Sequence, residues 1–125
     1  MDKIKLLYVD DEEINLFLFE EMMEDKYEVY LAYDGMQGLE VLKNNMDIEV
    51  IVSDLKMPKM SGLEMIYEAK KIKPEIPCFI LSGFEMIEDI RKAMKMNIII
   101  KYFMKPADWD RIDRTIKNFL GESEA

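Results

Sequence analysis

The chain of 125 residues contains no histidine. Imidazole is the usual general base of serine and cysteine hydrolases and the commonest metal ligand. Its absence therefore excludes Ser-His-Asp and Cys-His catalysis and histidine-ligated zinc. The chain cannot form a phosphohistidine of its own either, so any phosphohistidine chemistry would need a second molecule to carry that group.

Cysteine and long apolar runs are also scarce. Cys78 is the single cysteine, so no disulfide can form within the chain, which is typical of a reducing compartment. No apolar run approaches the ~20 residues that span a bilayer. The opening residues, Met1-Asp2-Lys3, do not resemble a signal peptide. We therefore expect a cytoplasmic protein.

Acidic residues outnumber basic ones: the chain has 17 lysines and arginines and 26 aspartates and glutamates, which gives a net charge of −9. Nucleic acids and anionic membranes repel a chain of this sign, so neither is an expected partner. The length favours one domain, which we expect at residues 1–121, followed by a short C-terminal tail at 122–125.

Strand-like and helix-like segments alternate from one end of the chain to the other. The strand-like segments are short and rich in Ile, Val, Leu, Tyr and Phe. Several are apolar without alternation, which is typical of strands covered on both faces. The predicted strands are Ile4–Asp10, Glu28–Tyr33, Glu49–Asp54, Pro77–Ser82 and Ile98–Met104.

Between these segments, apolar residues recur at spacings of three and four, which predicts helices. In the first interval this stripe consists of Ile14, Phe17, Leu18 and Met22, which we expect to face the core. The strict alternation predicts an α/β fold, in which a doubly wound, mostly parallel sheet carries helices on both faces.

The strand-like runs end on reactive side chains. The first stops on Asp10 and Asp11, the third on Asp54 and the fifth on Lys105, while Ser82 ends the fourth. The carboxyl ends of parallel strands share one edge of a sheet, and ligands bind at that edge. The pattern therefore predicts a single cleft that holds three carboxylates, a hydroxyl and an ammonium group.

These groups suit Mg²⁺ and phosphoryl transfer. Three crowded carboxylates repel one another, and a hard divalent cation such as Mg²⁺ relieves the repulsion. An oxygen of Asp54 can attack phosphorus and form an acyl phosphate. Lys105, as a compact positive charge, and the hydroxyl of Ser82 can contact the oxygens of the transferred group.

Four motifs carry these residues, and each stands at the end of a predicted strand. They are VDDEE (Val9–Glu13), SDLKMPKMSGLE (Ser53–Glu64), LSG (Leu81–Gly83) and YFMKP (Tyr102–Pro106). As an ordered set they are highly specific. The set resembles the receiver domains of bacterial two-component response regulators, and the resemblance extends from about Lys3 to Leu120.

The resemblance implies roles at the metal site and the phosphoacceptor. Asp54 matches the aspartate that is phosphorylated. Asp10 and Asp11 match the acidic metal-binding pair, with Asp11 expected to bind Mg²⁺ directly and Asp10 through water. Asp54 and the backbone carbonyl of Lys56 complete the expected ligands.

The resemblance also implies a flavodoxin-like fold with a five-stranded sheet in the order 2-1-3-4-5. Lys105 matches the lysine that contacts the phosphoryl group, and Pro106 matches a proline that follows a cis peptide bond. Ser82 matches a switch hydroxyl, and Tyr102 matches the aromatic residue that changes rotamer with it.

Three backbone features are predicted as well. Asp11 and Asp34 suit the N-caps of the first two helices. Many relatives have glycine just before the fifth strand, where this chain has Asn97. Asparagine tolerates the left-handed backbone conformation better than the residues around it, so we predict a positive φ at Asn97.

The expected function is that of a signalling receiver, which catalyses only its own phosphorylation and dephosphorylation at Asp54. A histidine kinase or a phosphotransfer protein would donate the phosphoryl group. Phosphorylation would shift the population between two states and reshape the face formed by the fourth helix, fifth strand and fifth helix. That face would contact a downstream effector or partner protein, or a second copy in a homodimer.

Two other functions are compatible with the same residues. A Mg²⁺-dependent phosphatase or phosphotransferase with an aspartyl-phosphate intermediate would share Asp54 and the metal site. Such enzymes generally have a second acid–base carboxylate shortly after the nucleophile, whereas Leu55-Lys56-Met57-Pro58 follows here. An interaction module that does not change state is the other alternative.

The sequence allows two routes by which a receiver could pass on its signal. No effector-like segment follows Gly121, so the chain either docks to a partner or is the receiver of a longer regulator.

Overall fold

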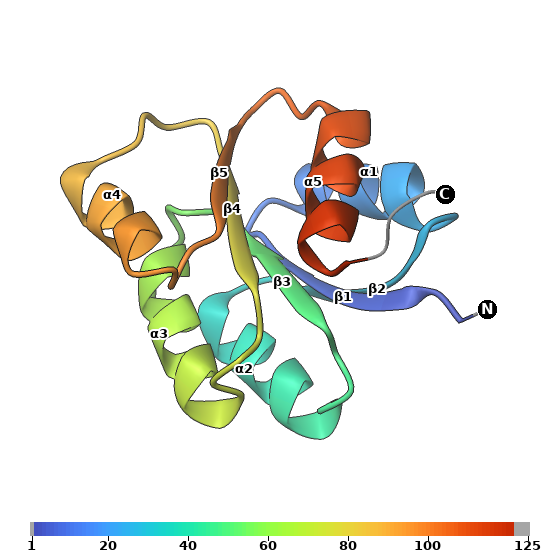
Figure 1. Cartoon of the computed structure of the whole chain (residues 1–125), viewed down its shortest axis with the longest axis horizontal. Helices are drawn as coiled ribbons and strands as arrows, with labels where there is room; N and C mark the ends of the chain where they lie inside the picture. Colours follow the sequence, from blue (N-terminus) through green and yellow to red (C-terminus); the bar gives the residue numbers. More distant parts are fainter. Residues whose placement is uncertain (1, 122–125) are drawn as a thin grey trace.

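The computed structural model describes residues 2–121. Within this range five strands and five helices alternate along the chain (Figure 1). In chain order they are β1 (Ile4–Val9), α1 (Glu13–Met23), β2 (Tyr27–Ala32), α2 (Gly35–Asn44), β3 (Val50–Ser53), α3 (Gly62–Ile72), β4 (Cys78–Ser82), α4 (Glu88–Lys95), β5 (Lys101–Met104) and α5 (Trp109–Phe119). The α/β class is confirmed. The expected tail at residues 122–125 lies outside the described residues.

The strands form one parallel sheet in the order β2-β1-β3-β4-β5. This is the predicted order 2-1-3-4-5. Because all five strands run in the same direction, their carboxyl ends lie along one edge of the sheet. The register determines which residues meet there: Val9 pairs with Ser53, and Ser82 pairs with Met104.

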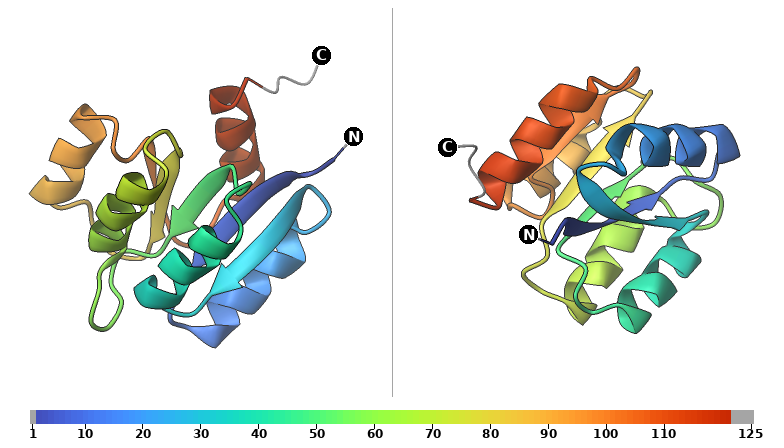
Figure 2. Two further views of the ribbon diagram at one scale, coloured as in Figure 1. Left: turned by 90° about the horizontal axis from the view of Figure 1, so that it is seen from below. Right: turned by 90° about the vertical axis from the view of Figure 1, so that its right-hand side faces the viewer.

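Helices cover both faces of the sheet, with α1 and α5 on one face and α2, α3 and α4 on the other (Figures 1 and 2). Each face has its own apolar core. Phe19 and Ile116 are buried under α1 and α5, and Leu42, Met65 and Ile90 are buried on the opposite face. The doubly wound architecture is therefore confirmed. No helix in residues 2–121 is long and apolar enough to cross a membrane.

The last strand is shorter than predicted. The sequence predicts a strand over Ile98–Met104, but β5 begins at Lys101. Asn97 has a φ of 61°, the left-handed conformation predicted for it. The N–H of Ile98 then donates to the carbonyl of Ala93 in α4, at 2.9 Å. The chain is still closing the end of α4 at Ile98 and Ile99, and its first hydrogen bond to β4 runs from the Ile100 N–H to the Cys78 carbonyl, at 2.8 Å. The strand itself therefore begins only at Lys101.

The predicted core face of α1 is wrong. Ile14, Phe17, Leu18 and Met22 are each between 43% and 60% exposed, and the buried residues of this helix are Phe19 and Met23. The physical reason is an aromatic contact in the core. The Phe19 ring stacks on the ring of Tyr8 in β1, with centroids 4.0 Å apart and planes 5° from parallel. The four-residue apolar stripe of α1 therefore faces outward.

One of the two predicted helix caps is confirmed. Asp34 is the N-cap of α2, and its side chain accepts a hydrogen bond from the N–H of Gln37 at 2.7 Å. Asp11 is not the N-cap of α1. That position belongs to Glu12, whose side chain makes no capping hydrogen bond. The Glu12 N–H donates to Asp10 at 2.9 Å, so the start of α1 is tied to an acidic residue at the end of β1.

Candidate functional site

The candidate side chains project from strand ends. Asp10 follows β1, Asp54 follows β3 and Lys105 follows β5, while Ser82 is the last residue of β4. Backbone hydrogen bonds continue beyond the strands themselves. The Asp54 N–H donates to the Val9 carbonyl at 2.8 Å, and the Lys105 N–H donates to the Ser82 carbonyl at 2.8 Å. These bonds hold the backbone at the sheet edge in a fixed arrangement.

Three carboxylates meet at this edge. Asp10, Asp11 and Asp54 each place one carboxylate oxygen within 4.8 Å of the other two. Asp10 and Asp54 are buried, whereas Asp11 is exposed. The donors are all oxygen, and one of them faces solvent, which fits Mg²⁺, an ion that takes a few carboxylates and keeps several waters. The structure brings together the three aspartates that the sequence grouped, and their role as metal ligands stays a prediction.

The Asp10 carboxylate is inaccessible to solvent and accepts three hydrogen bonds. One oxygen, Oδ1, accepts from the Glu12 N–H at 2.9 Å. The other, Oδ2, accepts from the Tyr8 hydroxyl at 2.6 Å and from the Lys105 Nζ at 3.0 Å. A buried charge is costly unless it is paired and hydrogen-bonded. These donors meet that requirement and orient the carboxylate.

Asp54 is 5% exposed and lies within reach of the same lysine. Its Oδ2 is 3.7 Å from the Lys105 Nζ, and its Oδ1 accepts from the Leu55 N–H at 2.8 Å. Burial raises the pKa of the Asp54 carboxyl above its usual value, the Lys105 ammonium opposes this rise, and the Asp10 carboxylate adds to it. Additional positive charge at the cluster would favour the ionised form, which is the form that can act as a nucleophile.

A glycine allows the chain to pass close behind Asp54. A Cβ on Gly62, the first residue of α3, would lie 2.0 Å from the Asp54 carbonyl oxygen and 3.0 Å from the Ser53 hydroxyl. The Gly62 N–H donates to the Leu55 carbonyl at 2.7 Å, so this close approach is part of the hydrogen-bonded structure. Glycine is the residue that permits it.

Ser82, Phe84 and Tyr102 form a connected group beside the acidic cluster. Ser82 is fully buried, and its hydroxyl accepts from the Phe84 N–H at 3.2 Å. Tyr102 is 8% exposed and donates its hydroxyl hydrogen to the Phe84 carbonyl. The Lys56 Nζ lies 4.4 Å from the centre of the Phe84 ring. The segment after β4 therefore links the proposed switch hydroxyl to the proposed switch aromatic, and the roles of Ser82, Tyr102 and the Lys56 carbonyl stay predictions.

Two residues of the site, Tyr8 and Gly62, are not among those expected from the sequence. Side chains two residues apart in a strand point to the same face. The position of Tyr8, two residues before Asp10, could therefore have predicted a contact between these two side chains. Gly62 carried no such signal, because its importance depends on how closely α3 approaches the end of β3. The Lys105–Pro106 peptide bond is cis, as the resemblance implied.

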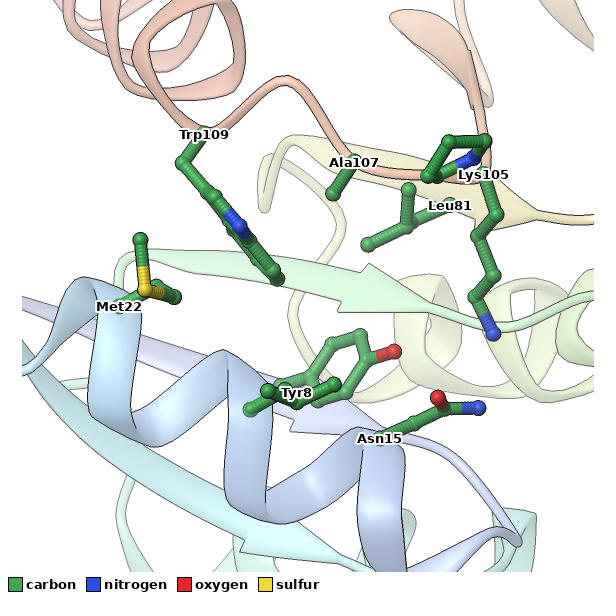
Figure 3. A pocket seen from close by; sticks show the side chains of 9 residues that line it. Tyr8, Asn15, Met22, Leu81, Lys105, Ala107 and Trp109 are labelled. Carbon is green, nitrogen blue, oxygen red and sulfur yellow. The ribbon is translucent and has the colours of Figure 1, made fainter.

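A largely apolar pocket of about 320 Å³ adjoins the acidic cluster (Figure 3). Its lining includes Tyr8 and Lys105, which both contact the acidic cluster, together with Leu18 and Met22 of α1 and Trp109 of α5. The exposed apolar stripe of α1 is therefore continuous with a hollow that reaches the candidate site.

Comparisons with known proteins agree with this geometry. The response regulator receiver domain family matches residues 6–117. The transcriptional regulatory protein ZraR of Salmonella typhimurium is 29% identical over 122 residues, which cover 97% of this chain and 27% of ZraR. The sporulation initiation phosphotransferase F of Bacillus subtilis is 27% identical over 117 residues, 93% of each chain. The chain thus spans about a quarter of ZraR and nearly all of the Bacillus protein.

A solved structure shows the same fold. A response regulator receiver domain protein from Clostridium thermocellum has a TM-score of 0.86 and 33% identity, and the match covers 94% of both chains. The chain therefore belongs to the response regulator receiver domain family. It is a receiver domain of two-component signal transduction. This membership favours the predicted signalling function over the phosphatase alternative.

Proposed function

We propose that the chain accepts a phosphoryl group on Asp54 in a Mg²⁺-dependent reaction and that this modification switches a partner-binding face. Receiver domains bind Mg²⁺ at an acidic pocket. We assign the ligands in this chain to Asp10, Asp11, Asp54 and the Lys56 carbonyl. The observation that carries the proposal is a single ammonium group, that of Lys105, 3.0 Å from Asp10 and 3.7 Å from Asp54 within the carboxylate cluster.

In the proposed reaction an ionised oxygen of Asp54 attacks the donor phosphorus. The bond from phosphorus to the histidine nitrogen, or to the acyl oxygen of a small donor, breaks, and its electron pair leaves with that atom. The product is an acyl phosphate on Asp54. Mg²⁺, when bound, would neutralise charge on the transferred oxygens. Lys105 supplies a further positive charge, and the Ser82 hydroxyl can donate to one of those oxygens.

The proposed switch uses the group formed by Ser82, Phe84 and Tyr102. Once a phosphoryl group draws the Ser82 hydroxyl toward itself, the Phe84 N–H loses its present acceptor. The Phe84 carbonyl, which holds the Tyr102 hydroxyl, moves with the same segment. The phosphorylated and unphosphorylated forms would then differ in the population of two states of the α4-β5-α5 face.

Incubation with Mg²⁺ and acetyl phosphate tests this function. The intact chain should gain the mass of one phosphoryl group, and Asp54→Ala should gain none, because the nucleophile is absent. Asp47→Ala is the matched control: it removes an exposed carboxylate paired with Lys5, remote from the cluster, and should be modified like the wild type. Equal modification of Asp54→Ala, or no modification of the wild type, would contradict the proposal.

We propose further that the protein donor docks over α1. The exposed stripe of Ile14, Phe17, Leu18 and Met22 presents apolar surface next to the pocket that reaches Lys105. Exposed apolar patches of this kind commonly mark interaction sites. A kinase or phosphotransfer protein bound there would hold its phosphohistidine near Asp54, whereas a small donor would need no such surface.

Leu18→Glu should therefore slow phosphotransfer from a histidine kinase that phosphorylates the wild type, by about tenfold or more, because a charge would be buried at the interface. Phosphorylation by acetyl phosphate should be unaffected. Met36→Glu is the control, since Met36 is 62% exposed on α2, across the sheet from α1. Equal loss with both donors would place the effect in the chemistry and contradict a docking role for Leu18.

We propose the following domain unit, location and output for the chain. Residues 1–121 form the receiver unit, which works in the cytoplasm and catalyses only its own phosphorylation and dephosphorylation. The α4-β5-α5 face contacts a downstream effector or partner, or a second copy of the chain. In ZraR the matched region is 27% of the protein, so the output of the present chain resides either in a separate partner or in further domains.

A further inference from the structure

Tyr8 is a buried residue of β1 whose hydroxyl touches the acidic cluster. It is 1% exposed, and its hydroxyl donates to Asp10 Oδ2 at 2.6 Å. Figure 3 shows the hydroxyl of Tyr8 directed toward the end of the pocket where the Lys105 side chain ends. Metal binding and phosphoryl transfer, as proposed above, give this hydroxyl no direct part, and its contact with the acidic cluster runs through Asp10.

The acceptor sites of Asp10 define what that role is. An ionised carboxylate has about four lone-pair sites, two on each oxygen. The Tyr8 hydroxyl and the Lys105 ammonium occupy both sites of Oδ2, and the Glu12 N–H occupies one site of Oδ1. One acceptor site is left, on Oδ1. Asp10 can therefore offer this site to a metal ion, or to a water bound to the ion, without giving up any present hydrogen bond.

The tyrosine ring is held firmly enough to impose this orientation. It stacks on Phe19 with centroids 4.0 Å apart, and Phe19 in turn meets Trp109 edge-on at 5.8 Å. A tyrosine hydroxyl carries its proton at neutral pH, and Asp10 can only accept, so the Tyr8 hydroxyl acts as the donor. A rigid ring with a protonated hydroxyl is a fixed donor.

We propose that Tyr8 is a positioning residue for the Mg²⁺ site, because its hydroxyl holds the Asp10 carboxylate with Oδ1 available to the ion or its water. The inference rests on the proposed function, since it concerns the same metal site. Without the hydroxyl, Lys105 would be the one donor to Oδ2 that remains among residues 2–121, and the carboxylate would be free to turn toward the ammonium group. Partners that hold ligand side chains typically contribute roughly 10–100-fold to metal affinity.

The test compares Tyr8→Phe with the wild type in a Mg²⁺ titration, followed by the NMR shifts of the Glu12 and Leu55 amides. Phenylalanine keeps the ring and its stacking and removes only the hydroxyl. The dissociation constant should rise about tenfold. The initial rate of phosphorylation by acetyl phosphate should fall at low Mg²⁺ and return to the wild-type rate at saturating Mg²⁺, because the ion and not the chemical step is affected.

Phe19→Leu is the second arm, since it weakens the stacking but keeps the hydroxyl. It should lower the melting temperature and raise the Mg²⁺ dissociation constant by less than Tyr8→Phe does, because the buried Tyr8 ring still carries its hydroxyl. An unchanged Mg²⁺ affinity in Tyr8→Phe, or a rate that saturating Mg²⁺ does not restore, would overturn the role of Tyr8 while leaving the proposed function intact. Wild-type chain that binds Mg²⁺ but takes no phosphoryl group would overturn only the proposed function, and wild-type chain that binds no Mg²⁺ would overturn both.

Discussion

Gly62→Ala should lower the free energy of unfolding by about 3 kcal/mol and slow the phosphorylation of Asp54. The added Cβ would lie 2.0 Å from the Asp54 carbonyl oxygen, well inside van der Waals contact. The clashing atom is backbone, so no side-chain rotation can relieve it. Either the start of α3 or the Asp54 backbone must shift, and the second shift would move the proposed nucleophile.

Denaturant unfolding measures the first effect, and the rate with acetyl phosphate and Mg²⁺ measures the second. Gly83→Ala is the matched control, because a Cβ on Gly83 would meet nothing within 4 Å. Its stability should stay within about 0.5 kcal/mol of the wild type, as for ordinary surface changes. If Gly62→Ala were as stable as Gly83→Ala, the close approach of α3 to Asp54 would not be a constraint on this fold.

The apolar pattern predicted the elements well and their edges less well. Unbroken apolar runs such as Val50–Val52 are strands because both faces of the sheet are covered by helices. The run Ile98–Ile100 looks the same in sequence, yet it lies in the turn between α4 and β5. Ile99 is nevertheless fully buried. An apolar run therefore indicates that its residues are buried. Where the strand begins is determined by the backbone turn at Asn97.

Helix α1 shows a second limit of periodicity. Its sequence carries apolar residues on more than one side, so the spacing of Ile14, Leu18 and Met22 is as regular as that of Phe19 and Met23. The choice between the two sides depends on what each meets in the folded chain. Phe19 meets the ring of Tyr8, a contact between segments that no local pattern contains.

The site was predictable where it depends on topology alone. Parallel strands bring their carboxyl ends together, so Asp10, Asp54 and Lys105 could be grouped from their positions after apolar runs. Tyr8 and Gly62 depend on distances between side chains and backbone across the fold. Those distances follow from packing, which the sequence does not display directly.

Lys105→Met should slow the phosphorylation of Asp54 by about 100-fold, comparable to the loss of one transition-state donor in other enzymes. Methionine keeps much of the apolar stem and removes the charge that lies 3.0 Å from Asp10 and 3.7 Å from Asp54. The same substitution should strengthen Mg²⁺ binding, because the lysine and the ion compete for the same carboxylates.

Two effects on Mg²⁺ oppose each other in this variant, and their sizes decide the sign. Asp10 loses a charged hydrogen bond, worth about 2 kcal/mol. The ion would also be relieved of a positive charge that lies in the same carboxylate cluster, and such a repulsion between a divalent cation and an ammonium group is on the order of 5 kcal/mol at an effective dielectric constant of about 20. The relief of repulsion is larger, so the Mg²⁺ dissociation constant should fall.

Tyr8 and Lys105 therefore make a matched pair, because both donate to the same oxygen of Asp10 and only one carries charge. Tyr8→Phe should weaken Mg²⁺ binding, whereas Lys105→Met should strengthen it and still slow phosphorylation. Lys101→Met controls for loss of a charge at the opposite end of β5 and should change neither quantity. Weaker Mg²⁺ binding in Lys105→Met would mean that hydrogen bonding outweighs charge at Asp10, and an unchanged phosphorylation rate would remove Lys105 from the proposed reaction.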